Sequence, residues 1–144
     1  MRILVICTGN ACRSQMAQGF LKSFDKRLEV CSAGTFPGNE VNKRAIRVMA
    51  EIGIDISHNY PKPVDLYLNE DWDFLITVCD QANEVCPVFP GKVKHRLHMG
   101  YVDPSFLGGT EEFIMGEFHK LREQMRNDLN KLYIEKIKPE LYPI

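Results

Sequence analysis

A cysteine and an arginine six residues apart bracket a short polar segment near the start of the chain. Residues 7–14 read Cys-Thr-Gly-Asn-Ala-Cys-Arg-Ser and follow the apolar run 3–6. A thiolate is a nucleophile, and the planar guanidinium of arginine binds two oxygens of one anion. The spacing therefore predicts that Cys7 acts as a nucleophile on a tetrahedral oxyanion that Arg13 holds.

The residues between Cys7 and Arg13 have the composition of an anion-binding loop. They join a predicted strand to a predicted helix, where unpaired N–H groups converge at the positive end of the helix. Gly9 can adopt backbone conformations closed to other residues, and Asn10 tolerates a positive φ. We expect the oxyanion to be bound by residues Thr8, Gly9, Asn10, Ala11, Cys12, Arg13 and Ser14. Taken singly, Cys7 is better explained as a core residue and Arg13 as a surface cation; only their combined placement favours the anion site.

Strand-like and helix-like segments alternate along the chain. Apolar runs predict four strands, at residues 3–6, 28–32, 72–78 and 94–99. Helical spacing is found at residues 17–24, at 41–52 with Gly53 as C-terminal cap, and from 111 onward, with shorter helices expected at 64–68 and 80–86. The alternation predicts an α/β fold, a four-stranded parallel sheet flanked by helices on both faces, as one catalytic domain over residues 1–144.

The loops that follow the strands should contain the site, because ligands of parallel α/β sheets bind beyond the carboxyl ends of the strands. Asp103 lies in the loop after the fourth predicted strand. A carboxylic acid there can protonate an oxygen that leaves the central atom of the anion, so Asp103 is the candidate general acid. Pro104 restricts the backbone of Asp103, although an Asp-Pro pair is most often a simple turn.

The composition excludes several classes of protein. Hydrophobic residues make up 44% and charged residues 26%, and the formal net charge is −1. These values are typical of a globular chain without the positive surface that nucleic acid or anionic membranes attract. The N-terminus has no signal-peptide pattern, so we expect a cytoplasmic protein with no nucleic-acid or membrane partner. Neither the five cysteines nor the four histidines have metal-ligand spacing, and no metal or cofactor is predicted.

Residues 7–17, Cys-Thr-Gly-Asn-Ala-Cys-Arg-Ser-Gln-Met-Ala, resemble the active-site loop of the low-molecular-weight tyrosine phosphatase superfamily, and within it the thioredoxin-coupled arsenate reductases. The resemblance extends to Ser-Ala-Gly at 32–34, to Gly-Ile-Asp-Ile-Ser at 53–57, to the cysteines after the third predicted strand, and to the Asp-Pro pair at 103–104. It covers nearly the whole chain and implies the same four-stranded fold, with Asp103 as the general acid.

The resemblance also assigns roles to Cys79 and Cys86. Cys79 attacks the arsenic-bearing Cys7, which releases arsenite and leaves a Cys7–Cys79 disulfide; Cys86 then forms a Cys79–Cys86 disulfide for thioredoxin to reduce. Residues seven apart in a helix are separated by about 10.5 Å of rise, whereas a disulfide needs Cα atoms within about 7 Å. A helix at 80–86 must therefore unwind on oxidation. The plainer alternative makes both cysteines packing residues.

Cys31, Cys12 and Gln18 are the remaining residues for which the sequence gives an expectation. Cys31, at the end of a predicted strand, is expected in the core. Cys12 either contributes only its backbone N–H or pairs with Cys7 on oxidation. Some reductases of the family bind potassium near the loop through Asn and Glu side chains; here Asn10 is present, but Gln18 replaces the acid, which argues against a potassium site.

Three functions are open on these grounds. Arsenate reductase is favoured, because a phosphatase has no need of the second and third thiols. A low-molecular-weight tyrosine phosphatase acting through a Cys7 phosphocysteine is the alternative. Its substrate calls for aromatic walls, for which the candidates are Phe36, Tyr101 and Phe106. Ser105, however, stands where the family has an aromatic residue. A non-enzymatic oxyanion or redox sensor is the third, against which the candidate general acid argues.

Overall fold

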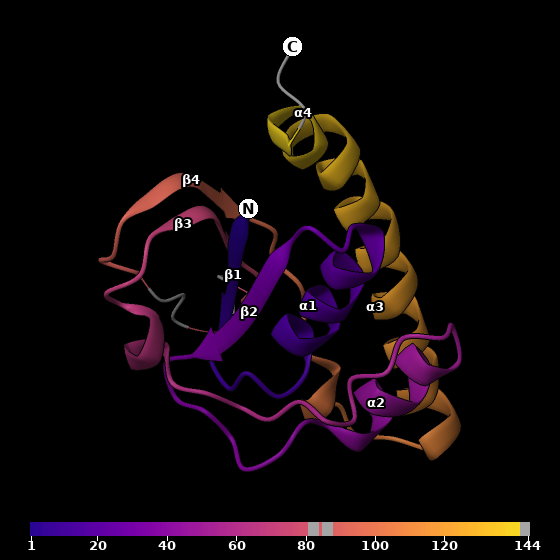
Figure 1. Ribbon diagram of the computed structural model, residues 1–144. Helices are drawn as coiled ribbons and strands as arrows, with labels where there is room; N and C mark the ends of the chain where they lie inside the picture. The colour runs from indigo at the N-terminus through magenta and orange to yellow at the C-terminus, as the bar shows by residue number, and fades with distance from the viewer. Residues whose placement is uncertain (81–83, 85–87, 142–144) are drawn as a thin grey trace.

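The computed structural model describes residues 1–80, 84 and 88–141. Four parallel strands form a sheet in the order β2-β1-β3-β4 (Figure 1). They are β1 (Arg2–Cys7), β2 (Glu29–Gly34), β3 (Trp72–Thr77) and β4 (Val93–His98). All four predicted strands are confirmed, with ends that move by one or two residues.

The helices also follow the predicted order. The longer ones are α1 (Arg13–Phe24), α2 (Lys43–Ala50) and α3 (Glu111–Leu132), and α3 continues through the π-helical turn η3 (Tyr133–Ile137) into α4 (Lys138–Leu141). Two 3-10 helices are η1 (Val64–Tyr67) and η2 (Pro104–Phe106). The helix expected at 80–86, with its redox-dependent unwinding, rests on residues 81–83 and 85–87, outside the described part of the chain.

Local signals explain where the helices begin and end. The Asn42 side chain accepts hydrogen bonds from the first N–H groups of α2, and the Thr110 hydroxyl accepts one at the start of α3. After α2, Gly53 has a φ of 81°, as the predicted C-terminal cap requires. These caps stabilise the helix ends without tertiary contacts.

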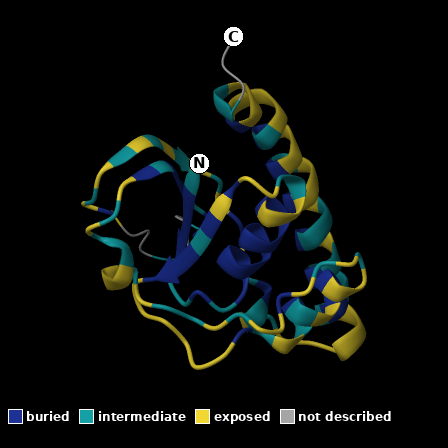
Figure 2. Ribbon diagram, in the orientation of Figure 1, coloured by how far each residue is buried: buried dark blue, intermediate teal, exposed yellow. Residues whose placement is uncertain are grey.

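The central strand β1 is buried on both faces of the sheet, whereas every second residue of the edge strand β4 is exposed. Every residue from Ile3 to Ile6 on β1 has no exposed surface (Figure 2). One face packs against a core that includes Phe20 and Leu21 of α1 and Phe118 and Met125 of α3. The other face has a smaller core, covered by η1 and the loop around Phe89. Helical segments thus cover both faces, and the longer helices α1 and α3 share one. Among the described residues, no helix has the length and apolar character needed to cross a bilayer.

The carboxyl ends of the strands bring the candidate loops together. Cys7, the last residue of β1, pairs with Gly34 on β2, and Ile6 pairs with Thr77 on β3. The chain passes from β1 to one neighbour and later returns to the other side, so β1 lies at the switch point of the sheet. The loop after Cys7 therefore lies at the centre of the edge where ligands are expected.

Candidate active site

The loop Thr8–Cys12 turns its carbonyl groups outward and its N–H groups inward. All five carbonyl oxygens accept hydrogen bonds from outside the loop, from the backbone N–H groups of Phe36, Gly38, Asn42 and Met16 and from the Gln15 side chain. Because a trans peptide points its N–H away from its C=O, the N–H groups of residues 9–13 face the interior. Among the described residues, those of Gly9, Ala11 and Cys12 have no acceptor. Several N–H groups that converge without an acceptor attract a negative charge, so this ring is suited to an anion.

Gly34 and Asn10 hold the loop in this shape. A Cβ on Gly34 would lie 2.4 Å from the Thr8 carbonyl oxygen and 3.0 Å from the Asn10 nitrogen, so the loop packs directly on the backbone of β2. Asn10 has a φ of 51°, a left-handed conformation that asparagine tolerates. Its side chain donates to the Ser14 hydroxyl at 2.7 Å and accepts from the Lys62 N–H at 2.9 Å. The loop is therefore fixed before any anion binds.

The sulfur of Cys7 contacts the backbone of the anion loop and the side chain of Ser14. It accepts a hydrogen bond from the Asn10 N–H at 3.2 Å and lies 2.9 Å from the Ser14 oxygen. Because the Ser14 oxygen already accepts from the Asn10 amide, its own proton is free to point at the sulfur. Both groups, together with the N-terminus of α1, stabilise a thiolate. The sequence predicted Ser14 near the anion but not its contact with Cys7.

Arg13 is buried beside Cys7 and carries its charge into the site. Its guanidinium donates to both oxygens of Glu84, to the carbonyl of Tyr101 at 3.0 Å, and lies 3.5 Å from Asp103. Burial by itself lowers the pKa of Arg13, but Glu84 and the charge of Asp103 raise it above its usual value. Arg13 is thus a permanent cation at the predicted position.

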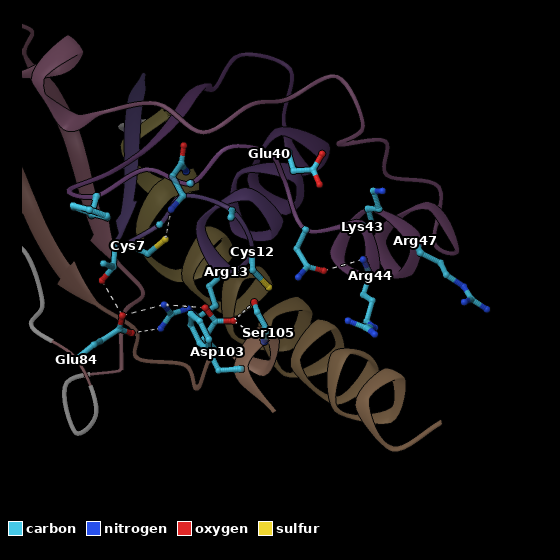
Figure 3. Close-up of a pocket in the computed structure, with 18 of the residues that line it drawn as sticks. Cys7, Cys12, Arg13, Glu40, Lys43, Arg44, Arg47, Glu84, Asp103 and Ser105 are labelled. Carbon is cyan, nitrogen blue, oxygen red and sulfur yellow. Dashed lines mark hydrogen bonds and ion pairs between the residues drawn. The ribbon is translucent and has the colours of Figure 1, made fainter. Parts of the chain in front are cut away.

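Asp103 faces Arg13 from the loop after β4. Asp103 is the N-cap of η2: one carboxylate oxygen accepts from the N–H and the hydroxyl of Ser105, and the other points toward Arg13. Ser105 therefore orients the Asp103 carboxylate. The structure brings Asp103, Arg13 and Cys7 to one cavity, as predicted (Figure 3).

The remaining cysteines differ in state. Cys7, Cys12 and Cys31 are free thiols, whereas Cys79 is fully buried and takes part in a disulfide. Burial, with a smaller effect from Asp103, raises the pKa of Cys12 well above its usual range, so Cys12 stays protonated at neutral pH. Cys31 is half-buried on β2, and burial raises its pKa too. Cys86 lies outside the described residues.

The cavity around Cys7 is larger than an oxyanion requires. Its volume is about 960 Å³, and it runs from the loop past α2, where Lys43, Arg44 and Arg47 line its far end (Figure 3). Phe36 and Phe106 line it and are 82% and 88% exposed.

The prediction of Tyr101 as an aromatic wall is wrong. The ring is buried, and its hydroxyl donates to Asp128 on α3 at 2.8 Å. Its carbonyl, not its ring, serves the site, by accepting from Arg13.

The oxygens that a potassium ion would need are already engaged. Gln18 Oε1 accepts from the Ser32 hydroxyl at 2.5 Å, and Asn10 Oδ1 accepts from the Lys62 N–H and from the Gln15 amide. Both acceptor positions of Asn10 Oδ1 are thus used, and Gln18 offers a neutral amide oxygen in place of a carboxylate, so these two residues fit a potassium site poorly.

Glu84 is the residue that the sequence analysis missed. Its carboxylate binds Arg13, accepts from the Thr8 hydroxyl at 2.8 Å and accepts from the Asp80 N–H at 2.6 Å. Partial burial by itself raises the pKa of Glu84, but these hydrogen bonds outweigh it and lower the pKa to about 2. No spacing or motif singles out Glu84, since its site partners Arg13 and Thr8 lie 71 and 76 residues away in the sequence.

Comparisons with known sequences show similarity to one phosphatase family and to arsenate reductases. The sequence profile of the family described as low molecular weight phosphotyrosine protein phosphatase matches residues 2–141. An arsenate reductase of Halalkalibacterium halodurans is 40% identical over 124 residues, which cover 85% of this chain and 88% of that protein. An arsenate reductase of Bacillus subtilis is 38% identical over 130 residues, covering 90% and 92%.

Solved structures of both activities are similar to this one. An arsenate reductase in the phosphate binding state has a TM-score of 0.73 at 26% identity, covering 93% of this chain and 97% of that one. A thioredoxin-dependent arsenate reductase of Corynebacterium glutamicum has a TM-score of 0.61 at 28% identity, covering 94% and 63%. A low molecular weight protein tyrosine phosphatase from T. tengcongensis has a TM-score of 0.69 at 26% identity, covering 94% and 99%.

Proposed function

The chain belongs to the low molecular weight phosphotyrosine protein phosphatase family, as its loop sequence indicated, and on that premise we propose that it is an arsenate reductase. Arsenate binds within the loop Thr8–Cys12, where the inward N–H groups and Arg13 hold its oxygens. Cys7 is the nucleophile and Asp103 the general acid. The observation that carries the proposal is the Cys7 sulfur, which accepts the Asn10 N–H of the loop and lines the same cavity as Arg13 and Asp103.

The chemistry needs two electrons, which thiols supply. The Cys7 thiolate attacks arsenic, an As–S bond forms, and one oxygen leaves as water after Asp103 donates a proton. A second thiolate then attacks the Cys7 sulfur. The electron pair of the As–S bond passes to arsenic, As(V) becomes As(III), and arsenite leaves while the two sulfurs form a disulfide.

We propose Cys79 as the second thiol. It follows β3 at the edge where Cys7 ends β1, since Ile6 pairs with Thr77 and the Val78 N–H donates to the Ile6 carbonyl at 3.0 Å. In the proposed relay, the third thiol attacks the Cys7–Cys79 disulfide, which frees Cys7 and leaves Cys79 in a new disulfide. A free Cys7 together with a disulfide-bonded Cys79 corresponds to that stage.

The third thiol and the reductant are proposed from the resemblance to the thioredoxin-coupled arsenate reductases. Cys86, which lies outside the described residues, is the proposed third thiol, and its disulfide with Cys79 would be the substrate of thioredoxin. A thioredoxin-dependent structural neighbour supports that reductant. The cytoplasmic location stays a prediction.

A coupled assay tests the proposal. Arsenate, thioredoxin, thioredoxin reductase and NADPH are supplied, and NADPH oxidation is followed. We expect arsenate-dependent oxidation by the wild type, its loss in Cys7→Ser and Cys79→Ser, and its retention in Cys31→Ser, which removes a thiol outside the site. Full turnover by Cys79→Ser would contradict the thiol relay.

A phosphatase is the second candidate, and the cavity favours it. A volume of about 960 Å³ with two exposed phenylalanines at its wall lies within the size range of sites for organic ligands, roughly 300–1,000 Å³. Hydrolysis of p-nitrophenyl phosphate that is lost in Cys7→Ser but unchanged in Cys79→Ser would support it. Phosphate binding without either activity would support the sensor.

A further inference from the structure

Glu84 places a carboxylate against the arginine that the oxyanion needs. Nη1 of Arg13 donates to Glu84 and to the Tyr101 carbonyl; Nη2 donates to Glu84 at 3.1 Å and lies 3.5 Å from Asp103. Among the described residues, only the buried Nε of this guanidinium has no partner. Glu84 therefore holds both terminal nitrogens of Arg13.

The carboxylate of Glu84 is itself held from several directions. The Thr8 hydroxyl and the Asp80 N–H donate to it, and the N–H of Glu84 donates to the Asp80 carbonyl at 3.0 Å. Thr8 belongs to the anion loop, while Asp80 directly follows Cys79. With a pKa near 2, the carboxylate stays ionised throughout the physiological range. The Glu84 carboxylate thus accepts hydrogen bonds from a guanidinium, a hydroxyl and a backbone N–H, the same kinds of donor that would bind a free oxyanion.

The charge balance around Arg13 determines what this contact does. A buried guanidinium attracts an oxyanion most strongly when its charge is uncompensated. Here Glu84 and Asp103 both face it, and Arg13 is only 3% exposed. An entering phosphate or arsenate must therefore displace Glu84 or bind to a guanidinium whose charge is already cancelled.

We propose that Glu84 is an internal counter-anion that lowers the affinity of the loop for oxyanions in the state in which Cys79 is disulfide-bonded. The inference rests on the proposed function for its purpose. A reductase whose thiols are oxidised cannot complete another turnover, and Glu84 keeps abundant phosphate from occupying the loop until the thiols are restored. Asp80, which directly follows the redox cysteine, exchanges two hydrogen bonds with Glu84, and this contact links the disulfide-bonded cysteine to the competing carboxylate.

Phosphate binding by the oxidised protein tests the proposal. Isothermal titration calorimetry with inorganic phosphate, without reductant and with the disulfide checked by thiol titration, compares the wild type with Glu84→Gln. If the carboxylate occupies Arg13 for about 90% of the time, its removal tightens the apparent Kd roughly tenfold. Glu40→Gln is the control, because Glu40 lines the same cavity, is exposed, and has no hydrogen bond or ion pair to any described residue. We expect it to change Kd by less than about twofold.

The sign of the effect decides between explanations. Equal or weaker phosphate binding by Glu84→Gln would overturn the proposal, since weaker binding is expected if Glu84 only orients Arg13. Glu84→Ala, which removes the whole carboxylate, should also tighten binding, and thermal unfolding verifies that each variant is folded. The measurement needs no turnover, so a protein that fails to reduce arsenate can still confirm or refute the role of Glu84.

Discussion

Replacing Gly34 with alanine should displace the anion loop. The added Cβ would lie 2.4 Å from the Thr8 carbonyl oxygen, and the two atoms must separate to at least 3.0 Å, a shift of 0.6 Å or more. The neighbours are loop backbone rather than a flexible side chain tip, so the strain falls on the loop itself. We expect a loss of about 3 kcal/mol of stability, the upper end for overpacking, and a Tm lower by about 10 °C.

The same displacement should impair catalysis. A shift approaching 1 Å in positioning groups costs up to about 100-fold in rate, so we expect kcat/KM for arsenate to fall by about 10- to 100-fold. Gly116→Ala is the matched control, because a Cβ there meets nothing within 4 Å. That variant, within α3, should gain about 0.5–1 kcal/mol from helix propensity and keep its activity. If Gly34→Ala keeps the wild-type Tm and kcat/KM, the packing argument is refuted.

Three further outcomes are expected. Arg13→Lys keeps the charge but loses the fork of N–H donors, so steady-state kcat/KM for arsenate should fall by about 100-fold or more, and a fall below about threefold would contradict the assigned role. The pKa of Glu84 is lowered from 4.5 to about 2, so its stabilising contacts are complete above about pH 4.5 and are lost as the pH falls toward 2. The stability difference between wild type and Glu84→Gln, from urea unfolding, should shrink over that range; a constant difference would refute the linkage. Asn10→Ala should be less stable than Asn10→Gly by about 1 kcal/mol in urea unfolding, because alanine is strained at a φ of 51°. Equal stabilities would speak against that strain.

The parts of the site that are contiguous in sequence could be predicted. Cys7, Asn10 and Arg13 lie within one strand–loop–helix unit, where a short spacing already decides which groups meet. Asp103 could be placed because the ends of parallel strands share one edge. The prediction of Tyr101 as a wall failed because its hydroxyl finds Asp128 on α3, a partner 27 residues away.

Local patterns therefore decided the strands, the helix ends and the composition of the anion loop, because hydrophobic period, caps and backbone preferences act over a few residues. Tertiary packing alone decided that Gly34 must lack a side chain and that Glu84 meets Arg13, 71 residues away. Those contacts form only when separate strands align and their loops meet. The energy of a charge pair or a backbone contact depends on that spatial distance rather than on the separation along the chain.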